Sequence, residues 1–250
     1  MSRPCKISLA EIDFLILCGG LGTRLRSVVS DRPKSLAKIQ SAPFLEIQLR
    51  YLIHQGARRF TLCAGHLGDE ISRFVETFSF PDCRVQVSKE PHALGTGGAL
   101  ANALDRIESP LFFALNGDSF CEVRLQEMLA MHQRMASQLT IATVNVPDTS
   151  AYGRVVSDTS HAITAFEEKN SGSKGAGSGM INAGIYLIDR TMFQNTAPKQ
   201  SAFSIEKDLF PKLVGHKLFA YPLPKGIFLD IGTPENYGRA ADVLKKFAGG

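Results

Sequence analysis

A glycine-rich segment followed by cations is the part of the sequence best suited to chemistry. After the apolar run Leu15-Ile16-Leu17 comes the segment Cys18-Gly19-Gly20-Leu21-Gly22-Thr23-Arg24-Leu25-Arg26, and Arg32-Pro33-Lys34 lies a few residues later. Because glycine has no Cβ, backbone N–H groups in such a segment can approach a ligand closely. A run of such amides forms an anion-binding concavity, and the cations add full charges. The combination favours binding of a triphosphate.

Two familiar phosphate-binding motifs do not match this segment. A Walker loop requires Gly-Lys-Ser/Thr, whereas Gly22 is followed by Thr23-Arg24. The dinucleotide-binding fingerprint requires a third glycine where the sequence has Leu25. A tight turn with solvated arginines is the alternative interpretation. Three glycines in four residues, with Thr-Arg and Pro-Lys behind them, favour a phosphate site instead.

Two distant aspartates could hold a divalent metal. Asn116-Gly117-Asp118 closes an apolar, strand-like run, and Asp230 follows Phe228-Leu229 in a similar setting. Mg²⁺ prefers carboxylate, phosphate and water oxygens, so the pair predicts a Mg²⁺ site between two phosphate-bearing substrates. Aspartates that merely form turns are the alternative. Lys34 suits phosphate oxygens as a compact charge, although most lysines are solvated surface residues.

Glu90 precedes a second glycine-rich segment, Leu94-Gly95-Thr96-Gly97-Gly98. A carboxylate offers two adjacent acceptors, which match the N1–H and amino donors of guanine but would repel the acceptors of uracil or thymine. If Glu90 lies in a base pocket, guanine is therefore the favoured base. A surface glutamate before a proline turn is the equally open alternative.

Alternating apolar runs predict the elements that position these residues. Strands are expected at Phe14–Leu17, 59–64, 84–88, 111–115 and 139–146, and helices at 43–55, 70–78, 96–107 and 125–135. This alternation predicts an α/β fold with a doubly wound, mostly parallel, Rossmann-like sheet. Ligands bind such sheets at the carboxyl ends of the strands, where the first glycine segment, the 90–98 segment and Asp118 converge.

The pattern changes after Val146. Strands are expected at 153–157, 180–188, 218–221 and 227–229, and helices at 203–214 and 234–247. The segment 171–179 is rich in glycine and serine, and is either a linker or a mobile loop beside an acceptor site. Glu168 and Lys169 precede it; they form either a surface charge cluster or contacts to sugar hydroxyls and a sugar phosphate.

Composition narrows the function class. The 250 residues are 44% hydrophobic and 21% charged, with net charge +4. The charges are mixed, so a nucleic-acid partner is not expected. The five cysteines are odd in number and lack CxxC spacing, which argues against a disulfide framework or zinc site. Residues 1–11 lack a signal-peptide core and no apolar run approaches a membrane span, so we expect a cytoplasmic protein without a membrane partner.

The ordered motifs resemble sugar-1-phosphate nucleotidylyltransferases. The resemblance runs from about Phe14 to Tyr237, and its motifs are those at 19–26 and 33–34, 94–99, 116–118, 152–153, 168–169, 181–186 and 230–234. Within that family, the cues at 25–29, the Gly-Thr-Gly-Gly segment, 203–208 and the Asp-Ile-Gly-Thr-Pro motif look most like D-glycero-α-D-manno-heptose 1-phosphate guanylyltransferases. Ser35 departs from the pattern, because relatives commonly carry proline there, which affects the rigidity of the loop.

The resemblance implies a reaction in which a sugar phosphate attacks the α-phosphorus of GTP in line and pyrophosphate leaves. It implies one nucleotidyltransferase domain over 1–250, with a nucleotide-binding part (about 12–146), a smaller sugar-phosphate-binding lobe (about 147–237) and a closing helix (234–247). Arg24, Lys34, Asp118 and Asp230 would be catalytic, the two aspartates holding Mg²⁺. The nucleotide would contact Leu17, Gly19, Gly20, Gly22, Thr23, Arg24, Glu90, Gly95, Thr96 and Asn116. The sugar phosphate would contact Gly153, Glu168, Lys169 and Asn182.

Other hypotheses remain open at this level. The acceptor could be mannose 1-phosphate, or the reaction could be uridylyl or thymidylyl transfer to glucose 1-phosphate, because small pocket changes admit different sugars. A non-catalytic sugar-nucleotide sensor on the same fold is a different class, and the intact Arg24, Lys34, Asp118 and Asp230 argue against it. The sequence leaves the oligomeric state open, a homo-oligomer included.

Overall fold

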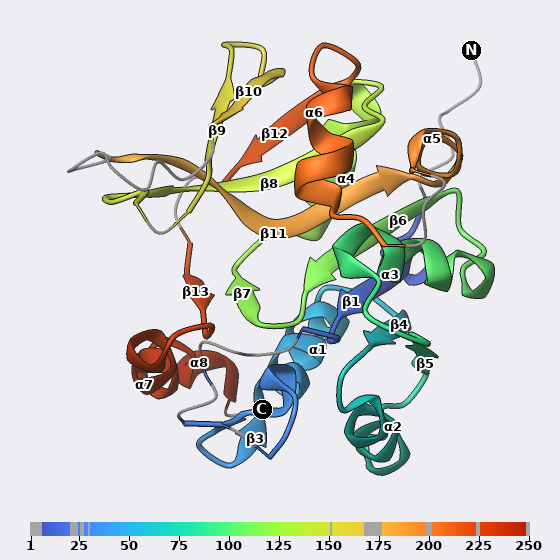
Figure 1. The fold of residues 1–250 in the computed structure, drawn as a ribbon, viewed down its shortest axis with the longest axis vertical. Coiled ribbons are helices and arrows are strands. Elements are labelled where there is room, and N and C mark those ends of the chain that lie inside the picture. Colours follow the sequence, from blue (N-terminus) through green and yellow to red (C-terminus); the bar gives the residue numbers. More distant parts are fainter. Residues whose placement is uncertain are drawn as a thin grey trace.

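The computed structural model describes residues 7–20, 25, 28–29, 31–150, 152–167, 177–198, 202–223 and 226–248. These residues form a central nine-stranded sheet with helices on both faces (Figure 1). The path of the sheet is β10 (Ile163–Glu167), β9 (Arg154–Ser157), β11 (Gly179–Asp189), β6 (Leu111–Asn116), β1 (Asp13–Leu17), β4 (Arg59–Ala64) and β5 (Arg84–Lys89). β8 (Leu139–Val146) pairs with β11 and β12 (Leu218–Pro222).

The predicted α/β fold is confirmed, but parallel pairing is limited to β1, β4, β5 and β6 in the first part of the sheet and to the pair β8–β12 in the later part. β1 pairs in parallel with β4 and with β6, and β4 pairs in parallel with β5. β11 then runs antiparallel to β6, β8 and β9, so the sheet is mixed. The short strand-like runs after Val146 did not reveal the direction of β11, because direction depends on which neighbour it pairs with.

The helices cover the sheet on two sides. One side carries α1 (Phe44–His54), α2 (Gly68–Thr77) and α4 (Leu125–Arg134), and the other carries α3 (Gly95–Ala103), α5 (Arg190–Thr196) and α6 (Phe210–Leu213). The side chains of β1 explain this arrangement. Phe14 and Ile16 belong to the hydrophobic core on the side of α1, α2 and α4, which we call the first core, whereas Leu15 belongs to the second core, on the side of α3, α5 and α6. Successive side chains of a strand point to opposite faces, so a wholly apolar strand needs cover on both sides.

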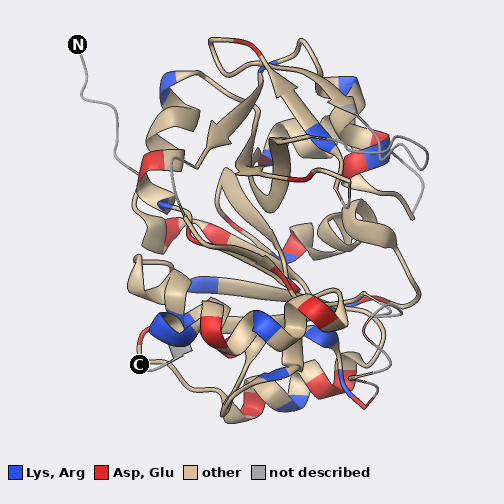
Figure 2. Ribbon diagram, turned by 90° about the vertical axis from the view of Figure 1, so that its left-hand side faces the viewer, with Lys and Arg blue, Asp and Glu red and all other residues tan. Residues whose placement is uncertain are grey.

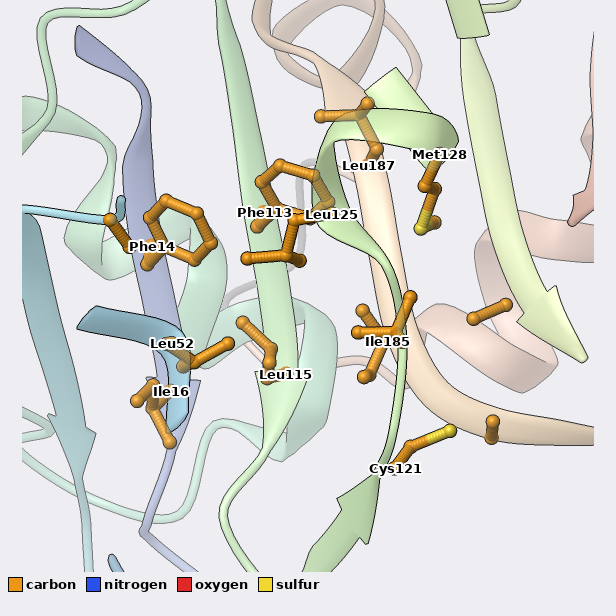
Figure 3. Packing of buried hydrophobic residues seen from close by; sticks show 14 of the residues in the cluster. Phe14, Ile16, Leu52, Phe113, Leu115, Cys121, Leu125, Met128, Ile185 and Leu187 are labelled. Carbon is orange, nitrogen blue, oxygen red and sulfur yellow. The ribbon is translucent and has the colours of Figure 1, made fainter. Parts of the chain in front are cut away.

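The first core is continuous across three neighbouring strands. Figure 3 shows Phe14 and Ile16 of β1, Phe113 and Leu115 of β6, and Ile185 and Leu187 of β11, with Leu52 of α1 and Leu125 and Met128 of α4. The rings of Phe14 and Phe113 stack with centroids 4.8 Å apart. Burial of each such side chain stabilises the fold by roughly 1.5–3 kcal/mol. This packing holds the end of β1 against β4 and β6.

A third cluster fixes the C-terminal part beside the end of the sheet. α7 (Pro234–Val243) contributes Ala240, and β13 (Phe228–Asp230) contributes Leu229, which packs with Phe120 of β7 (Ser119–Cys121) and Phe44 of α1. Figure 1 shows α7 and α8 (Lys245–Ala248) near α1, where Phe247 contacts Tyr51 edge to face. The strand pair β7–β13 carries Asp230 to the sheet end at which Asp118 lies.

Several helix predictions were too simple. The helix expected at 96–107 is α3 followed by a 3₁₀ turn at Leu104–Arg106. The helix expected at 203–214 is a π-helical turn, Ile205–Leu209, continued by α6. Pro211 has no N–H to donate and its ring crowds the carbonyl four residues earlier, which explains the widened turn. The single helix expected at 234–247 is α7 and α8.

Some short elements were not predicted. They are β2 (Lys38–Ile39), β3 (Ala42–Pro43), β7, β10 and α5. A strand of two or three residues shows no full period of alternation. The N-cap of α5 is Asp189, whose side chain accepts a hydrogen bond from the Met192 N–H at 2.6 Å. Such an N-cap is a local signal that could have revealed the helix.

Charged residues of both signs are interspersed over the helices, and the central strands are largely uncharged (Figure 2). Within the described ranges, no helix is both long enough and apolar enough to traverse a lipid bilayer.

Candidate active site

The segment after β1 shows two different uses of glycine. A Cβ on Gly19 would lie 2.5 Å from Glu90 Oε1 and 2.7 Å from the Gly65 nitrogen, so Gly19 is required for close packing. A Cβ on Gly20 would meet no atom of the described residues within 4 Å, its two chain neighbours aside. Gly20 therefore borders open space, where its backbone is accessible to a ligand. Gly22, Thr23 and Arg24 were also expected here; they lie outside the described residues.

Lys34 lies at the first position of a 3₁₀ turn (Lys34–Leu36), immediately after Pro33. Its Nζ is 3.4 Å from Oδ2 of Asp118, and its side chain is only 14% exposed. The alternative of a solvated surface lysine is therefore wrong. An ammonium group held beside a carboxylate at a sheet end is suited to a phosphate-bearing ligand or to a ligand–metal complex.

The two distant aspartates lie on neighbouring strands. Asp118 directly precedes β7, and Asp230 ends β13 opposite Ser119. The Ile231 N–H donates to the Asp118 carbonyl at 2.9 Å. Asp230 Oδ1 accepts from the Gly232 N–H at 2.6 Å, which fixes the turn after the strand. Tertiary structure thus brings the backbones of two aspartates together that are more than a hundred residues apart in the sequence.

The polar half of a cleft lies beside Lys34, Asp118 and the end of β1, and Asp230 is not among its lining residues. Its volume is about 220 Å³. Four of the predicted site residues besides Lys34 and Asp118 line it, namely Leu17, Gly20, Thr96 and Asn116, together with Cys18, Ser35, Gly117 and Glu206. Leu17 and Asn116 are register partners at the carboxyl ends of β1 and β6, which is where ligands bind open α/β sheets. We call this space the phosphate compartment.

A second, more apolar compartment adjoins the first and shares Leu17, Gly20 and Thr96 with it. Its volume is also about 220 Å³, and its other lining residues are Gly19, Glu90, Ala93, Gly95 and Ala99. Glycine and alanine residues line most of this space, and Glu90 is the single carboxylate in it. We call this space the base compartment, because its volume and lining suit a nucleobase.

Glu90 follows β5 and is half-buried in the base compartment. Its Oε2 accepts from the Leu94 N–H at 3.0 Å, while Oε1 lies against Gly19 and Gly65. Burial raises the pKa of this carboxyl above its ordinary value, and the Leu94 hydrogen bond and nearby His92 oppose that rise. The surface-glutamate alternative is therefore wrong, and a carboxylate with spare lone pairs borders the compartment.

In the second glycine segment, the space beside the glycines is filled mainly by another part of the protein. Gly95 has φ +71°, and a Cβ there would lie 2.6 Å from the Phe203 carbonyl oxygen. A Cβ on Gly97 would lie 2.1 Å from the Phe203 ring. The N–H groups of Gly97 and Gly98 both donate to the Phe203 carbonyl, at 2.9 and 3.3 Å. Gly95 and Thr96 line the cleft as expected, but the glycines themselves admit Phe203.

Six lining residues were not among the predicted site residues: Cys18, Ser35, Gly117 and Glu206 in the phosphate compartment, and Ala93 and Ala99 in the base compartment. Cys18 and Ser35 are buried behind Lys34, and burial raises the pKa of the Cys18 thiol to about 12, so it stays protonated. Glu206 comes from the π-helical turn and hydrogen-bonds to Thr96 Oγ1 at 2.7 Å. The sequence singles out 203–208 only as a motif. No local signal shows that its glutamate faces a cleft.

The expected sugar-phosphate residues lie on a different part of the sheet. Asn182 is on β11, where its Oδ1 accepts from the Gly184 N–H and its Nδ2 donates to the Tyr186 hydroxyl, both at 2.9 Å. Gly153 directly precedes β9, whose Arg154 pairs with Ile181. Gly153 and Asn182 are therefore close to each other, but neither residue lines the phosphate compartment or the base compartment. Glu168 and Lys169 lie outside the described residues.

The carboxyl groups of Asp118 and Asp230 are the candidate ligands for a divalent cation. No group of three or more His, Cys, Asp and Glu residues suited to a metal occurs among the described residues. Two carboxylates at a strand end nevertheless fit Mg²⁺, which usually takes only one or two protein carboxylates and completes its shell with phosphate oxygens and water.

Comparison with known proteins agrees with this geometry. A D-glycero-alpha-D-manno-heptose 1-phosphate guanylyltransferase of Aneurinibacillus thermoaerophilus is 33% identical over 94% of this chain and 100% of that protein. Mannose-1-phosphate guanylyltransferase 1 of Arabidopsis thaliana is 34% identical over 89% of this chain but only 62% of its own length. The crystal structure of HddC from Yersinia pseudotuberculosis complexed with GMP-PN matches with a TM-score of 0.80 at 35% identity, over 92% of this chain and 98% of that one.

The family model described as nucleotidyl transferase matches residues 14–246, from the first residues of β1 to α8. That range contains the glycine segment after β1, the Lys34–Asp118 pair, both cleft compartments and Asp230. The chain therefore belongs to the nucleotidyl transferase family.

Proposed function

We propose that this protein transfers GMP from GTP to a sugar 1-phosphate, most specifically D-glycero-α-D-manno-heptose 1-phosphate, with release of pyrophosphate. The observation that carries the proposal is the cleft itself. It places a half-buried carboxylate in an apolar base compartment, next to a phosphate compartment that contains Lys34 and Asp118. The similarity to a heptose guanylyltransferase along nearly the full length of both chains supports the acceptor.

The base compartment supports guanine. Glu90 presents acceptor oxygens there, and guanine has two adjacent donors on its Watson–Crick edge. Its raised pKa means that a ligand with donors relieves a buried charge. The GMP-PN complex of the similar HddC structure is consistent with the same base. With guanine in that compartment, the phosphates extend past Gly20 toward Lys34.

The reaction needs positioning and neutralisation of charge rather than a covalent intermediate. An oxygen of the sugar phosphate attacks the α-phosphorus of GTP, the bond to the β-phosphate oxygen breaks, and pyrophosphate leaves with the electron pair. Lys34 binds phosphate oxygens, and the Gly20 backbone borders the path of the triphosphate. Arg24, outside the described residues, is proposed to steady the leaving pyrophosphate.

Asp118 and Asp230 would hold Mg²⁺. When bound, the ion supplies positive charge to the reacting phosphates. On the acceptor side we propose that Gly153, Glu168, Lys169 and Asn182 bind the sugar phosphate. The proximity of Gly153 to Asn182 across β9 and β11 supports their acting together.

Mannose 1-phosphate is the second candidate acceptor. The similarity to a plant mannose-1-phosphate guanylyltransferase favours it, although the chain spans only about 62% of that protein. Both acceptors require the same binding site for GTP, so the two compartments of the cleft do not discriminate between the acceptors. Their discrimination depends on the sugar-facing residues.

The decisive experiment measures pyrophosphate release from a matrix of GTP, ATP, UTP and dTTP against heptose, mannose and glucose 1-phosphates with Mg²⁺. We expect turnover with GTP and the heptose phosphate to exceed every other pair. Lys34→Ala should lose most of this activity, while Lys38→Ala, on the exposed side of the next strand, should retain it. No pyrophosphate release with any pair, or a preference for UTP over GTP, would contradict the proposal.

A further inference from the structure

Glu206 is the polar residue of the cleft that the proposed reaction leaves without a role. It follows the N-cap Ser204 in the π-helical turn Ile205–Leu209 and is half-buried. It lines the phosphate compartment together with Lys34, Asp118 and Asn116. A glutamate is an unexpected lining residue in a space that accepts phosphates, because two like charges repel each other.

Hydrogen bonds hold the Glu206 carboxylate in one orientation. Oε2 accepts from the Thr96 and Ser204 hydroxyl groups, each at 2.7 Å. Thr96 Oγ1 in turn accepts from the Ile205 N–H at 3.0 Å. The carboxylate is thereby fixed to the first turn of α3, at the boundary that the two compartments share.

The other oxygen retains most of its capacity. Among the described residues, Oε1 has a single long hydrogen bond, from the Tyr186 hydroxyl at 3.4 Å. That hydroxyl itself accepts from Asn182 Nδ2 at 2.9 Å, so its proton is directed to Glu206. No described Lys or Arg forms an ion pair with Glu206. An ionised carboxylate has about four acceptor positions, so Oε1 can accept further hydrogen bonds from the cleft.

The chemistry that fits is a hydroxyl group. Phosphate oxygens are acceptors and carry negative charge, so they cannot pair with Oε1. Hydroxyl groups donate, and hydrogen bonds from hydroxyls to a fixed carboxylate are short and strong. In nucleotidyl transfer, two sugar rings approach this compartment, the ribose of the nucleotide and the ring of the acceptor.

We propose that Glu206 is a specificity-determining residue that accepts hydrogen bonds from hydroxyl groups of a sugar ring in the phosphate compartment. The inference rests on the proposed function for the presence of a sugar there. The links to Thr96 on the nucleotide side and, through Tyr186, to Asn182 on the acceptor side admit either ring as the source.

The test compares wild type, Glu206→Gln and the control Glu76→Gln, which changes an exposed glutamate of α2. Turnover with GTP and the best sugar 1-phosphate gives kcat and both KM values, and calorimetry gives Kd for each ligand alone. We expect Glu206→Gln to raise KM and Kd for one of the two ligands by about 10- to 100-fold, the usual effect of losing a hydrogen bond to a charged group. Glu76→Gln should match wild type.

Deoxy analogues identify the ring and separate recognition from a structural role. If the ribose is bound, 2′-deoxyGTP or 3′-deoxyGTP should bind wild type as weakly as GTP binds Glu206→Gln, and the variant should not distinguish the analogue from GTP. If Glu206 binds the acceptor sugar, a deoxy sugar 1-phosphate should bind wild type as weakly as the full sugar 1-phosphate binds Glu206→Gln, and the variant should not distinguish the two sugar phosphates. A purely structural residue would weaken all ligands alike and lower Tm.

The outcomes separate this inference from the reaction. Turnover by wild type with unchanged KM and Kd values in Glu206→Gln would overturn the role of Glu206 and leave the transferase intact. A similar loss with every ligand and analogue would also overturn it. No turnover by wild type with any pair would overturn the proposed function, and the calorimetric Kd values would still decide whether Glu206 contacts a hydroxyl of GTP or of a sugar phosphate.

Discussion

The two glycine-rich segments look alike in sequence and serve different purposes in the fold. At the first, Gly20 borders the open cleft, where a Cβ would touch none of the described residues beyond its chain neighbours. At the second, Gly95 and Gly97 admit the backbone and ring of Phe203, whose carbonyl accepts the Gly97 and Gly98 N–H groups. Gly20 therefore exposes its backbone to the cleft, whereas the second segment donates its amides to the protein. Glycine content alone therefore does not identify a phosphate loop.

The largest effect should come from the charged residues beside the first segment. Asp118→Asn removes one carboxylate of the proposed metal pair, so Mg²⁺-dependent pyrophosphate release should fall by ~10²- to 10³-fold, the scale for loss of a charge-stabilising group. Tm should stay within about 2 °C, because Asp118 borders a cleft rather than a core. The control Asp105→Asn changes an exposed aspartate. Turnover near the wild-type rate would remove Asp118 from the metal site.

At the second segment, substitution should damage folding instead. Gly97→Ala places a Cβ in the Phe203 ring, and overpacking of this kind costs about 1–3 kcal/mol, so Tm should drop by about 4–10 °C. Phe203→Leu in the same chain should restore part of the loss, because the smaller side chain leaves room, and the coupling is measured by a double-mutant cycle. Equal stability of Gly97→Ala and wild type would show that Phe203 moves aside freely.

Gly20→Ala is the matched substitution in the first segment. The added Cβ meets no protein atom, so Tm should not fall. The same Cβ narrows the passage between the two compartments, and we expect the KM for GTP to rise about 3- to 10-fold, which corresponds to ~1 kcal/mol. A fall in Tm similar to that of Gly97→Ala would erase the difference between the segments.

The smallest effect concerns Glu90, which packs against the first segment. Burial raises the pKa of this carboxyl, so the native state holds its proton more tightly than the unfolded chain does. The free energy of unfolding therefore falls as pH rises through the ordinary and the raised pKa, and is unaffected below both. Glu90→Gln should raise Tm by about 1 °C near pH 7, because solvent screening limits the effect. Near pH 3 the same substitution should leave Tm unchanged.

The same variant should also weaken the preference for GTP over ATP and UTP, measured as the ratio of kcat/KM values. Gln retains the acceptor for the Leu94 N–H but offers guanine one acceptor and one donor instead of two acceptors. A variant with lower stability near pH 7 and unchanged base preference would show that Glu90 is a structural capping residue.

Much of this arrangement was predictable from local pattern. Apolar runs and helical spacing identified the strands β1, β4, β5, β6 and β8 and the helices between them to within a few residues. The end of each parallel strand then predicted where Gly20, Asn116 and Asp118 would meet, because those ends share one edge of the sheet. These are short-range properties: burial on both faces, periodicity, and the chemistry of single residues.

Only the tertiary structure decided the rest. The antiparallel direction of β11, the seating of Phe203 on Gly95 and Gly97, and the entry of Glu206 into the cleft all join residues far apart in the chain. Each depends on which surfaces pack, and a residue's type does not encode its long-range neighbour. The sequence by itself determined the α/β class and the donor chemistry around Lys34 and Asp118. Packing decided which glycine faces a ligand and which faces the protein.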